Sequence, residues 1–142
     1  MHFWDQHKTI TYYYETLTRW VCNQYELTQM EYDILMFLYN NPQYNTAADI
    51  VKVRKSTKSH VSTSLKLLED KGLVEKKPRE GNKKHIEIIL LDAAQEIVKA
   101  GLNVQENFIN NIFRGLTEEE VLTCKSVFAK ICNNAENCLK DK

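Results

Sequence analysis

The chain has 142 residues, 43% of them hydrophobic and 27% charged, and its 19 Lys and Arg are balanced by 19 Asp and Glu. With only two Pro and four Gly, this composition is typical of one globular domain and excludes collagen-like and low-complexity chains. The sequence has neither the run of about 20 apolar residues that spans a membrane nor a signal peptide, so we expect a single cytoplasmic domain over residues 1–142, without a membrane partner.

The first half of the chain has the periodicity of amphipathic helices. Apolar side chains recur at helical spacing over residues 8–25 and predict an aromatic-rich first helix. Capping boxes that begin at Thr28 and Thr46 predict two further helices. The first of these is expected to end before Pro42, and the second is expected to cover about residues 46–53.

A fourth helix is predicted over residues 58–71, because Thr57 can cap its first turn and Gly72 can follow its last turn. Its apolar side chains are spaced four and then three residues apart, which places them on one buried stripe. The stripe consists of Val61, Leu65 and Leu68. Hydroxyl and cationic side chains fall on the other faces of this helix.

Two strands are predicted to follow, over residues 73–77 and 85–91. The residues between them, 78–84, are expected to form the loop of a β-hairpin, since Gly81 and Asn82 allow a permissive backbone. A two-stranded ribbon is marginally stable alone, so we expect it to pack against the helices.

Two long helices are predicted at the end of the chain. Asp92 is expected to cap a helix over residues 93–113, and a capping box at Thr117 begins a helix over residues 118–137. Apolar side chains of the last helix alternate at spacings of three and four: Val121, Cys124, Phe128, Ile131, Ala135 and Cys138. Such a seam packs against other helices, from the same chain or from a second copy.

The balanced net charge hides two opposed parts. Residues 52–85 hold eleven Lys and Arg against four Asp and Glu, an excess of seven positive charges. The rest of the chain holds eight Lys and Arg against fifteen Asp and Glu, an excess of seven negative charges. A local cationic excess of this size favours binding to a polyanion.

The order of elements within residues 28–91 is that of a winged helix-turn-helix, in which a short helix, a turn and a polar-faced helix precede a β-ribbon. We therefore expect a mainly α fold with a small β-hairpin wing, flanked by helical segments over residues 1–27 and 92–142.

The polar faces of this segment suggest contacts with DNA. The major groove admits a helix whose outer face is polar, and the candidates on the fourth helix are Lys58, Ser59, His60, Ser62, Thr63 and Lys66. Candidates for the phosphate backbone are Arg54, Lys55, Arg79, Lys83 and Lys84. His60 can equally be a half-exposed side chain without a role in binding.

The stretch TAADIVKVRKSTKSHVSTSLKLLEDKGLVEKK, with the later GNKKHIEIIL, resembles the winged helix-turn-helix of MarR-family transcriptional regulators. LTQMEYDILMFL is similar to the helix that precedes it in that family. The resemblance extends over essentially the whole chain and includes the flanking segments 1–27 and 92–142, which the family uses for dimerisation.

The resemblance implies a sequence-specific regulator that binds double-stranded DNA as a homodimer and acts as an effector-responsive repressor. Its two recognition helices would enter successive major grooves of a pseudo-palindromic site. The resemblance assigns Ser59, Ser62, Thr63 and Lys66 to the groove and Lys83 to the wing.

The wing departs from the family's pattern, which often contains an Asp–Arg brace. Here Asn82 is neutral, and Lys83 lacks the planar fork of an arginine. We therefore expect this wing to contact phosphates.

Two other functions are compatible with the same residues. A winged helix can bind a protein instead of DNA, in which case the cations only solvate its surface. Cys22, Cys124 and Cys138 are candidates for a thiol switch, which needs exposure and a lowered pKa. Because buried cysteines behave as small hydrophobes, Cys124 and Cys138 are instead expected to pack in a core.

Small-molecule chemistry has weaker support in the sequence. Tyr12, Tyr13 and Tyr14 with Trp20 can line an effector pocket, although such a stripe is more often interface core. His2 and its neighbours lie at a terminus, so no metal site is expected. The sequence has no phosphate loop, nucleophile elbow or metalloprotease motif, and therefore predicts no enzyme and no cofactor.

Overall fold

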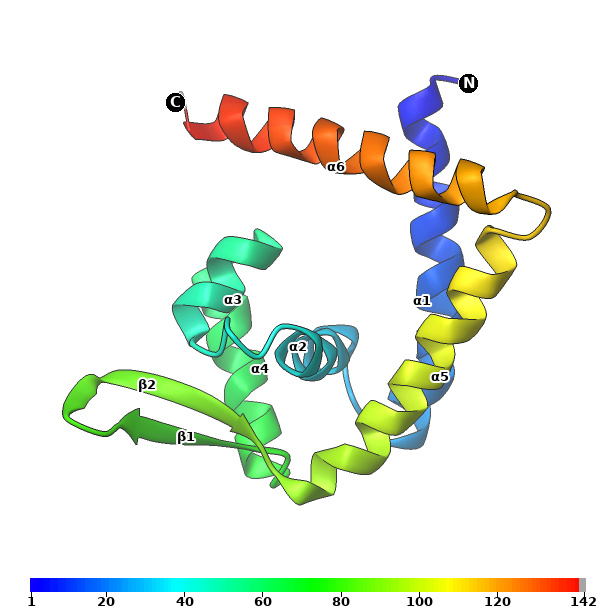
Figure 1. The fold of residues 1–142 in the computed structure, drawn as a ribbon. Coiled ribbons are helices and arrows are strands. Elements are labelled where there is room, and N and C mark those ends of the chain that lie inside the picture. The colour runs from blue at the N-terminus through cyan, green and yellow to red at the C-terminus, as the bar shows by residue number, and fades with distance from the viewer. Residues whose placement is uncertain (141–142) are drawn as a thin grey trace. The chain divides into compact units, whose positions relative to one another are not determined.

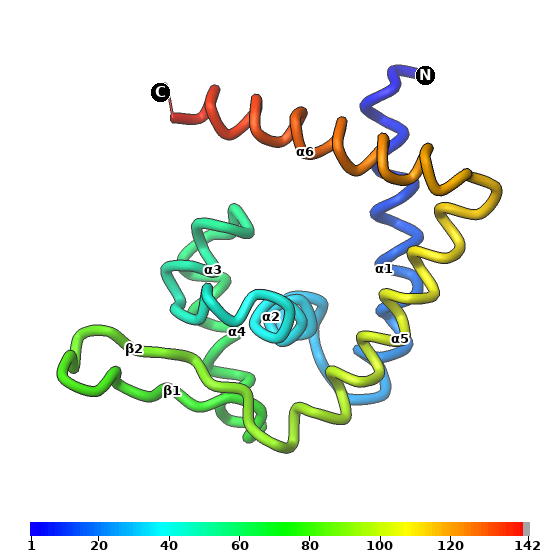
Figure 2. The backbone as a smooth tube through the Cα atoms, viewed as in Figure 1, coloured from blue at the N-terminus to red at the C-terminus, as the bar shows by residue number. Residues whose placement is uncertain are grey.

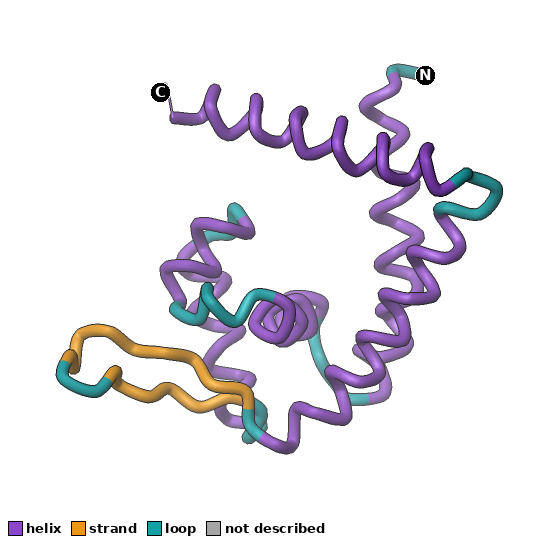
Figure 3. The backbone as a smooth tube through the Cα atoms, in the orientation of Figure 1, coloured by secondary structure: helices purple, strands orange, loops and turns teal. Residues whose placement is uncertain are grey.

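The computed structural model describes residues 1–140 (Figure 1). By its internal contacts the chain divides into two compact units, Met1–Phe108 and Ile109–Lys142, and each is described by itself. Figure 2 traces the backbone and Figure 3 shows that helices dominate, with a single hairpin among the described residues. None of the helices within residues 1–140 is long and apolar enough to cross a membrane.

The helices and strands follow the predicted order. They are η1 (Phe3–Gln6), α1 (His7–Gln24), α2 (Gln29–Asn40), α3 (Ala47–Arg54), α4 (Lys58–Asp70), β1 (Val74–Arg79), β2 (Asn82–Leu90), η2 (Asp92–Ala94), α5 (Gln95–Ile112) and α6 (Glu118–Lys140). The mainly α fold with a hairpin wing is thus confirmed, whereas its division into functional segments stays a prediction.

Helix α2 forms the centre of the core in the first unit, where eight of its twelve residues are buried. In Figure 1 it is seen nearly end-on, with α3 and α4 on one side and α1 and α5 on the other. The expected capping box starts it: the Glu31 amide donates to Thr28 Oγ1 at 3.1 Å, and the Thr28 amide donates to Glu31 Oε1 at 3.0 Å. A local sequence signal therefore fixes where the central helix begins.

Helix α5 packs closely on α2 at a glycine. Gly101 is buried, and a Cβ atom at this position would overlap the side chain of Met36 and lie 3.0 Å from Tyr32 Oη. The missing side chain lets the two helices approach.

The predicted hairpin loop over residues 78–84 is wrong. The strands extend further, so that Pro78 pairs with Ile86 and only Glu80 and Gly81 form the turn. Gly81 has a φ of 80°, which suits a tight turn. Pro78 is tolerated because each strand of a two-stranded sheet has a free edge that needs no amide.

Two further contacts attach the hairpin to the helices. The Ile88 amide donates to the Asn45 carbonyl at 2.7 Å, and the Leu91 amide donates to the Leu73 carbonyl at 2.9 Å. The wing therefore has a fixed base beside α3 and α4.

The prediction that Asp92 caps the fifth helix is also wrong. Asp92 is the first residue of the 3-10 helix η2, and α5 begins only at Gln95. The acidic side chain that suggested a cap belongs to a tighter turn at the entry of the helix.

Helix α6 of the second unit begins at the expected capping box, in which the Glu120 amide donates to Thr117 Oγ1 at 3.1 Å. No residue of this helix is buried within the described chain. The expected core packing of Cys124 and Cys138 is therefore wrong for this chain, since both are exposed.

Candidate nucleic-acid interface

A tight turn joins α3 to α4. Lys55 ends α3 in the left-handed conformation with a φ of 56°, and the Ser56 amide donates to the Val51 carbonyl at 3.1 Å. Thr57 then caps α4, because its Oγ1 accepts from the His60 amide at 3.2 Å. These bonds fix the direction in which α4 leaves the turn.

Helix α4 has one apolar and one polar side, as the sequence predicts. Val61, Leu65 and Leu68 are buried together with Ser64, which the sequence analysis did not assign to this stripe although it lies three residues after Val61. The six groove candidates are all exposed: Lys58, Ser59, His60, Ser62, Thr63 and Lys66. The helix thus offers a polar surface on a core-anchored scaffold.

The wing carries its cations on an ordered tip. Arg79, Lys83 and Lys84 are exposed, and Asn82 Oδ1 accepts from the Lys84 amide at 3.1 Å. Arg79 Nε lies 3.7 Å from Glu87 Oε1 on the opposite strand. The neutral Asn82 therefore shapes the turn, while a brace of opposite charges lies further down the ribbon.

Arg54 has a different environment from the other phosphate candidates. Its guanidinium donates to Asp33 Oδ2 at 3.2 Å, and its side chain is 32% exposed. The contact ties the end of α3 to α2. Lys55 also turns back, since its Nζ donates to the Lys52 carbonyl at 3.0 Å. Arg54 and Lys55 therefore both stabilise the turn between α3 and α4, in addition to being candidates for contact with phosphates.

Lys71 is one of the eleven cations of residues 52–85, and its position in the sequence gives no sign of its structural role. Its Nζ donates to Glu31 Oε2 at 2.8 Å and to the Glu26 carbonyl at 2.7 Å. Because Lys71 follows the last residue of α4, this contact anchors the end of the helix to the start of α2. The two residues lie 40 positions apart in sequence, so no local motif signals the pair.

Cys22 lies in the core and lacks the features of a reactive thiol. Burial, with the nearby charges of Asp33 and Glu31, raises the pKa of its thiol to about 11. A thiol switch needs the opposite shift. Of the three candidates, only Cys124 and Cys138 are exposed, and Cys132 is exposed on the same helix.

Alkylation by iodoacetamide at pH 8 is expected to reach Cys22 last. Its thiolate is scarce at this pH and its side chain is covered, so mass spectrometry should find Cys22 unmodified while Cys132, which is exposed on α6 and lies off its apolar seam, reacts. The same protein in denaturant is the control, and all four cysteines should react there. Early modification of native Cys22 would contradict its buried position.

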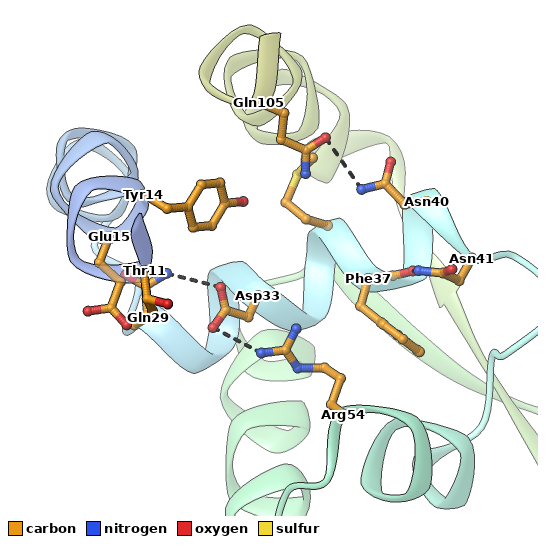
Figure 4. A pocket seen from close by; sticks show the side chains of 11 residues that line it. Thr11, Tyr14, Glu15, Gln29, Asp33, Phe37, Asn40, Asn41, Arg54 and Gln105 are labelled. Carbon is orange, nitrogen blue, oxygen red and sulfur yellow. Dashed lines mark hydrogen bonds and ion pairs between the residues drawn. The ribbon is translucent and has the colours of Figure 1, made fainter. Parts of the chain in front are cut away.

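The four aromatic side chains of the predicted stripe lie in two different environments. Tyr13 and Tyr14 pack against Phe108, with ring centroids 5.9 and 5.0 Å apart, whereas Tyr12 and Trp20 are exposed. Tyr14 also lines a pocket of about 310 Å³ between α1, α2, α5 and the end of α3 (Figure 4). Within residues 1–140 no three His, Cys, Asp or Glu side chains are grouped as metal ligands.

Comparison with known proteins points to one family. Residues 25–85 match the model of the MarR family, and no curated protein matches the sequence. A MarR protein from Peptoclostridium difficile has a similar structure, with a TM-score of 0.84, 18% identity and coverage of 100% of this chain and 93% of that chain.

Several of the similar structures contain DNA. A MepR–DNA complex from S. aureus has a TM-score of 0.78 and 20% identity, with 95% of this chain and 96% of that chain covered. A putative MarR-family regulator from Listeria monocytogenes with a 26mer DNA has a TM-score of 0.81 and 19% identity, with 92% and 86% covered. The chain is thus similar to the MarR family over its winged helix, and it shares its fold with these solved structures.

Proposed function

We propose that the chain is a DNA-binding transcriptional regulator. The observation that carries the proposal is the exposed polar face of α4, beside a cationic wing, on a segment with an excess of seven positive charges. A helix of this kind fits the major groove, and an exposed cationic tip can follow the phosphates. Similar structures that contain DNA support the same function.

We further propose that it binds a pseudo-palindromic site as a homodimer. Exposed apolar side chains support the homodimer, because a monomer rarely leaves large apolar patches in contact with water. On α6 it includes Leu122, Val127, Phe128 and Ile131, and in the first unit Phe3, Trp4 and Trp20. A second copy that covers this surface would also present a second recognition helix to the next major groove.

The remaining parts of the proposal concern regulation. We expect a cytoplasmic repressor, without enzymatic activity, whose binding to DNA responds to a small molecule. The pocket that Tyr14 lines supports a ligand, because it is concave and combines aromatic with polar side chains.

Salt titration tests the proposal. Duplex DNA is first selected from a random pool, and its affinity is then measured between low and physiological salt. Neutralising about 6–10 phosphates predicts a log–log slope of about −5 to −9. A protein-binding winged helix would show a flat response or no binding at low salt, and an asymmetric selected site would contradict the homodimer.

The variant Lys83→Ala is expected to weaken binding to every duplex by a similar factor. Lys83 is exposed on the wing and serves as a point charge for a phosphate, so its loss should make the salt slope about one unit shallower. Fluorescence anisotropy with the selected site and with an unrelated duplex measures both effects. A loss confined to the selected site would mean that the wing reads bases or groove shape.

A further inference from the structure

A second pocket lies between the helix-turn-helix and the wing. Helix α4 packs against both α3 and β1 (Figure 1), and a cavity of about 540 Å³ remains where residues of these three elements meet. Five of its eight lining residues are apolar: Ala47, Ala48, Val51, Val61 and Leu65. An apolar hollow thus interrupts the polar and cationic surface that is expected to face DNA.

The apolar surface of the pocket that solvent can reach belongs mainly to α3. Val61 and Leu65 of α4 are at most 1% exposed, so they close the bottom of the pocket. The side chains of Ala47 and Ala48 are exposed, and that of Val51 is half-buried. Because Ser62, a candidate for the major groove, lines the same pocket, the pocket opens beside the groove face of α4.

Two cations complete the lining of the pocket. Lys58 of α4 and Lys76 of β1 are both exposed, and neither forms an ion pair with any residue within 1–140. A purely apolar partner would gain nothing from these two ammonium groups. A DNA duplex, in contrast, presents phosphates on both sides of a groove that contains apolar groups, so the charges of the pocket favour DNA as its occupant.

Helix α4 has few side chains that identify a base by paired hydrogen bonds. Guanine is recognised most often by arginine or lysine, and adenine by asparagine or glutamine. The helix contains no Arg, Asn or Gln, and hydroxyls such as those of Ser59 and Thr63 bond to more than one kind of base. Its lysines, His60 and apolar contact therefore remain as the main sources of sequence preference.

Thymine offers the apolar group that such a pocket can recognise. Its C5-methyl group projects into the major groove, and none of the other three bases carries one. The lining of α4 extends from Lys58 to Leu65, a length of about 10 Å along the helix axis. Since successive bases of a strand are about 3.4 Å apart, the pocket can face the methyl groups of about three successive thymines.

We propose that this pocket recognises a short run of thymines in each half-site through their methyl groups. Ala47, Ala48 and Val51 contact the methyl groups, while Lys58 and Lys76 bind phosphates beside them. The proposal gives α3, which carries none of the groove candidates, a role in sequence specificity. It deepens the proposed DNA-binding function and rests on it.

Replacing thymine by uracil tests the proposal, because it removes the methyl group and keeps the base pair. The duplex selected from a random pool is expected to contain a run of thymines in each half-site. Uracil in one such run should weaken binding about fourfold for each methyl group contacted, which corresponds to about 0.8 kcal/mol per buried CH₂ group. Fluorescence anisotropy with the full chain measures the loss. The control duplex carries the same number of uracils outside the half-sites and should bind like the parent duplex.

The possible outcomes distinguish the pocket from the function on which it rests. Selected half-sites without adjacent thymines, or equal affinity for the thymine and uracil duplexes, would overturn the proposal and leave the pocket to another occupant, such as an apolar side chain of a protein. An equal loss with the control duplex would also overturn it, since uracil would then act through the flexibility of the DNA. A protein that binds no duplex at all would instead refute the proposed DNA-binding function.

Two matched variants locate the contact on α3. Val51→Thr keeps the shape of the side chain but puts a hydroxyl in the pocket, and should reduce the loss caused by uracil at least twofold. Val53→Thr makes the same change at an exposed position of α3 that does not line the pocket, and should keep the full loss. The ratio of the two affinities is measured on one protein, so it does not depend on how much of a variant folds. An unchanged ratio in Val51→Thr would overturn the assignment of the methyl groups to this pocket.

Discussion

Replacing Lys71 by methionine is expected to lower the free energy of unfolding by about 2 kcal/mol. The side chain of Glu31 is 1% exposed, and Lys71 Nζ lies 2.8 Å from its Oε2. Removal of one partner from a buried pair costs about 3–5 kcal/mol, because the other charge is left in a poor solvent. The value here is smaller because the side chain of Lys71 is 34% exposed and water can replace part of the contact.

Urea unfolding followed by circular dichroism measures this effect. Lys66→Met is the matched control, since Lys66 Nζ lies 3.6 Å from Asp70 Oδ1 in a pair whose side chains are 71% and 60% exposed. Such an exposed pair contributes about 0.3–0.5 kcal/mol. Equal losses in the two variants would contradict the special role of Lys71.

A double variant separates charge from packing. Glu31→Gln keeps an oxygen that can accept from the Thr28 amide, so Glu31→Gln with Lys71→Met removes the unpaired carboxylate without removing the cap. We expect it to be more stable than Lys71→Met alone. If the two losses simply add, Lys71 acts through its aliphatic stem and not through its charge.

The parts of the fold that sequence analysis predicted depend on neighbours in sequence. Thr28, Thr46 and Thr57 cap helices because each hydroxyl accepts from an amide three residues later. The inward stripe of α4 follows from its spacing in the same way. These interactions are complete within a single turn, and therefore a short stretch of sequence determines them.

The features of the fold that could not be predicted depend on contacts between residues far apart in sequence. Lys71 and Arg54 count as free cations in any tally of charge, yet they pair with Glu31 and Asp33 across 40 and 21 positions. The short hairpin turn also escaped prediction, because Gly81 and Asn82 indicated a longer loop and only the pairing with β2 extends β1 to Arg79. Tertiary contacts decided each of these cases.

The variant Lys66→Ala is expected to weaken binding to the selected DNA site by about 1–2 kcal/mol, or about 5–30-fold, in the range of a single base contact. Lys66 is exposed on α4, away from the buried Val61, Leu65 and Leu68. Loss of its pair with Asp70 should change stability by only about 0.5 kcal/mol. Circular dichroism of the variant should therefore match that of the parent protein.

The control for charge is Lys99→Ala, which removes one exposed cation of α5 outside the cationic segment 52–85. Anisotropy titrations with the selected site and with an unrelated duplex distinguish the outcomes. We expect Lys66→Ala to lose affinity mainly for the selected site, and Lys99→Ala to lose little for either duplex. An equal loss for both duplexes, with a salt slope about one unit shallower, would mean that Lys66 binds a phosphate as Lys83 is expected to do. A base contact requires that α4 lie deep in the groove, since the ammonium group of Lys66 can then reach the edges of the bases before it meets the backbone.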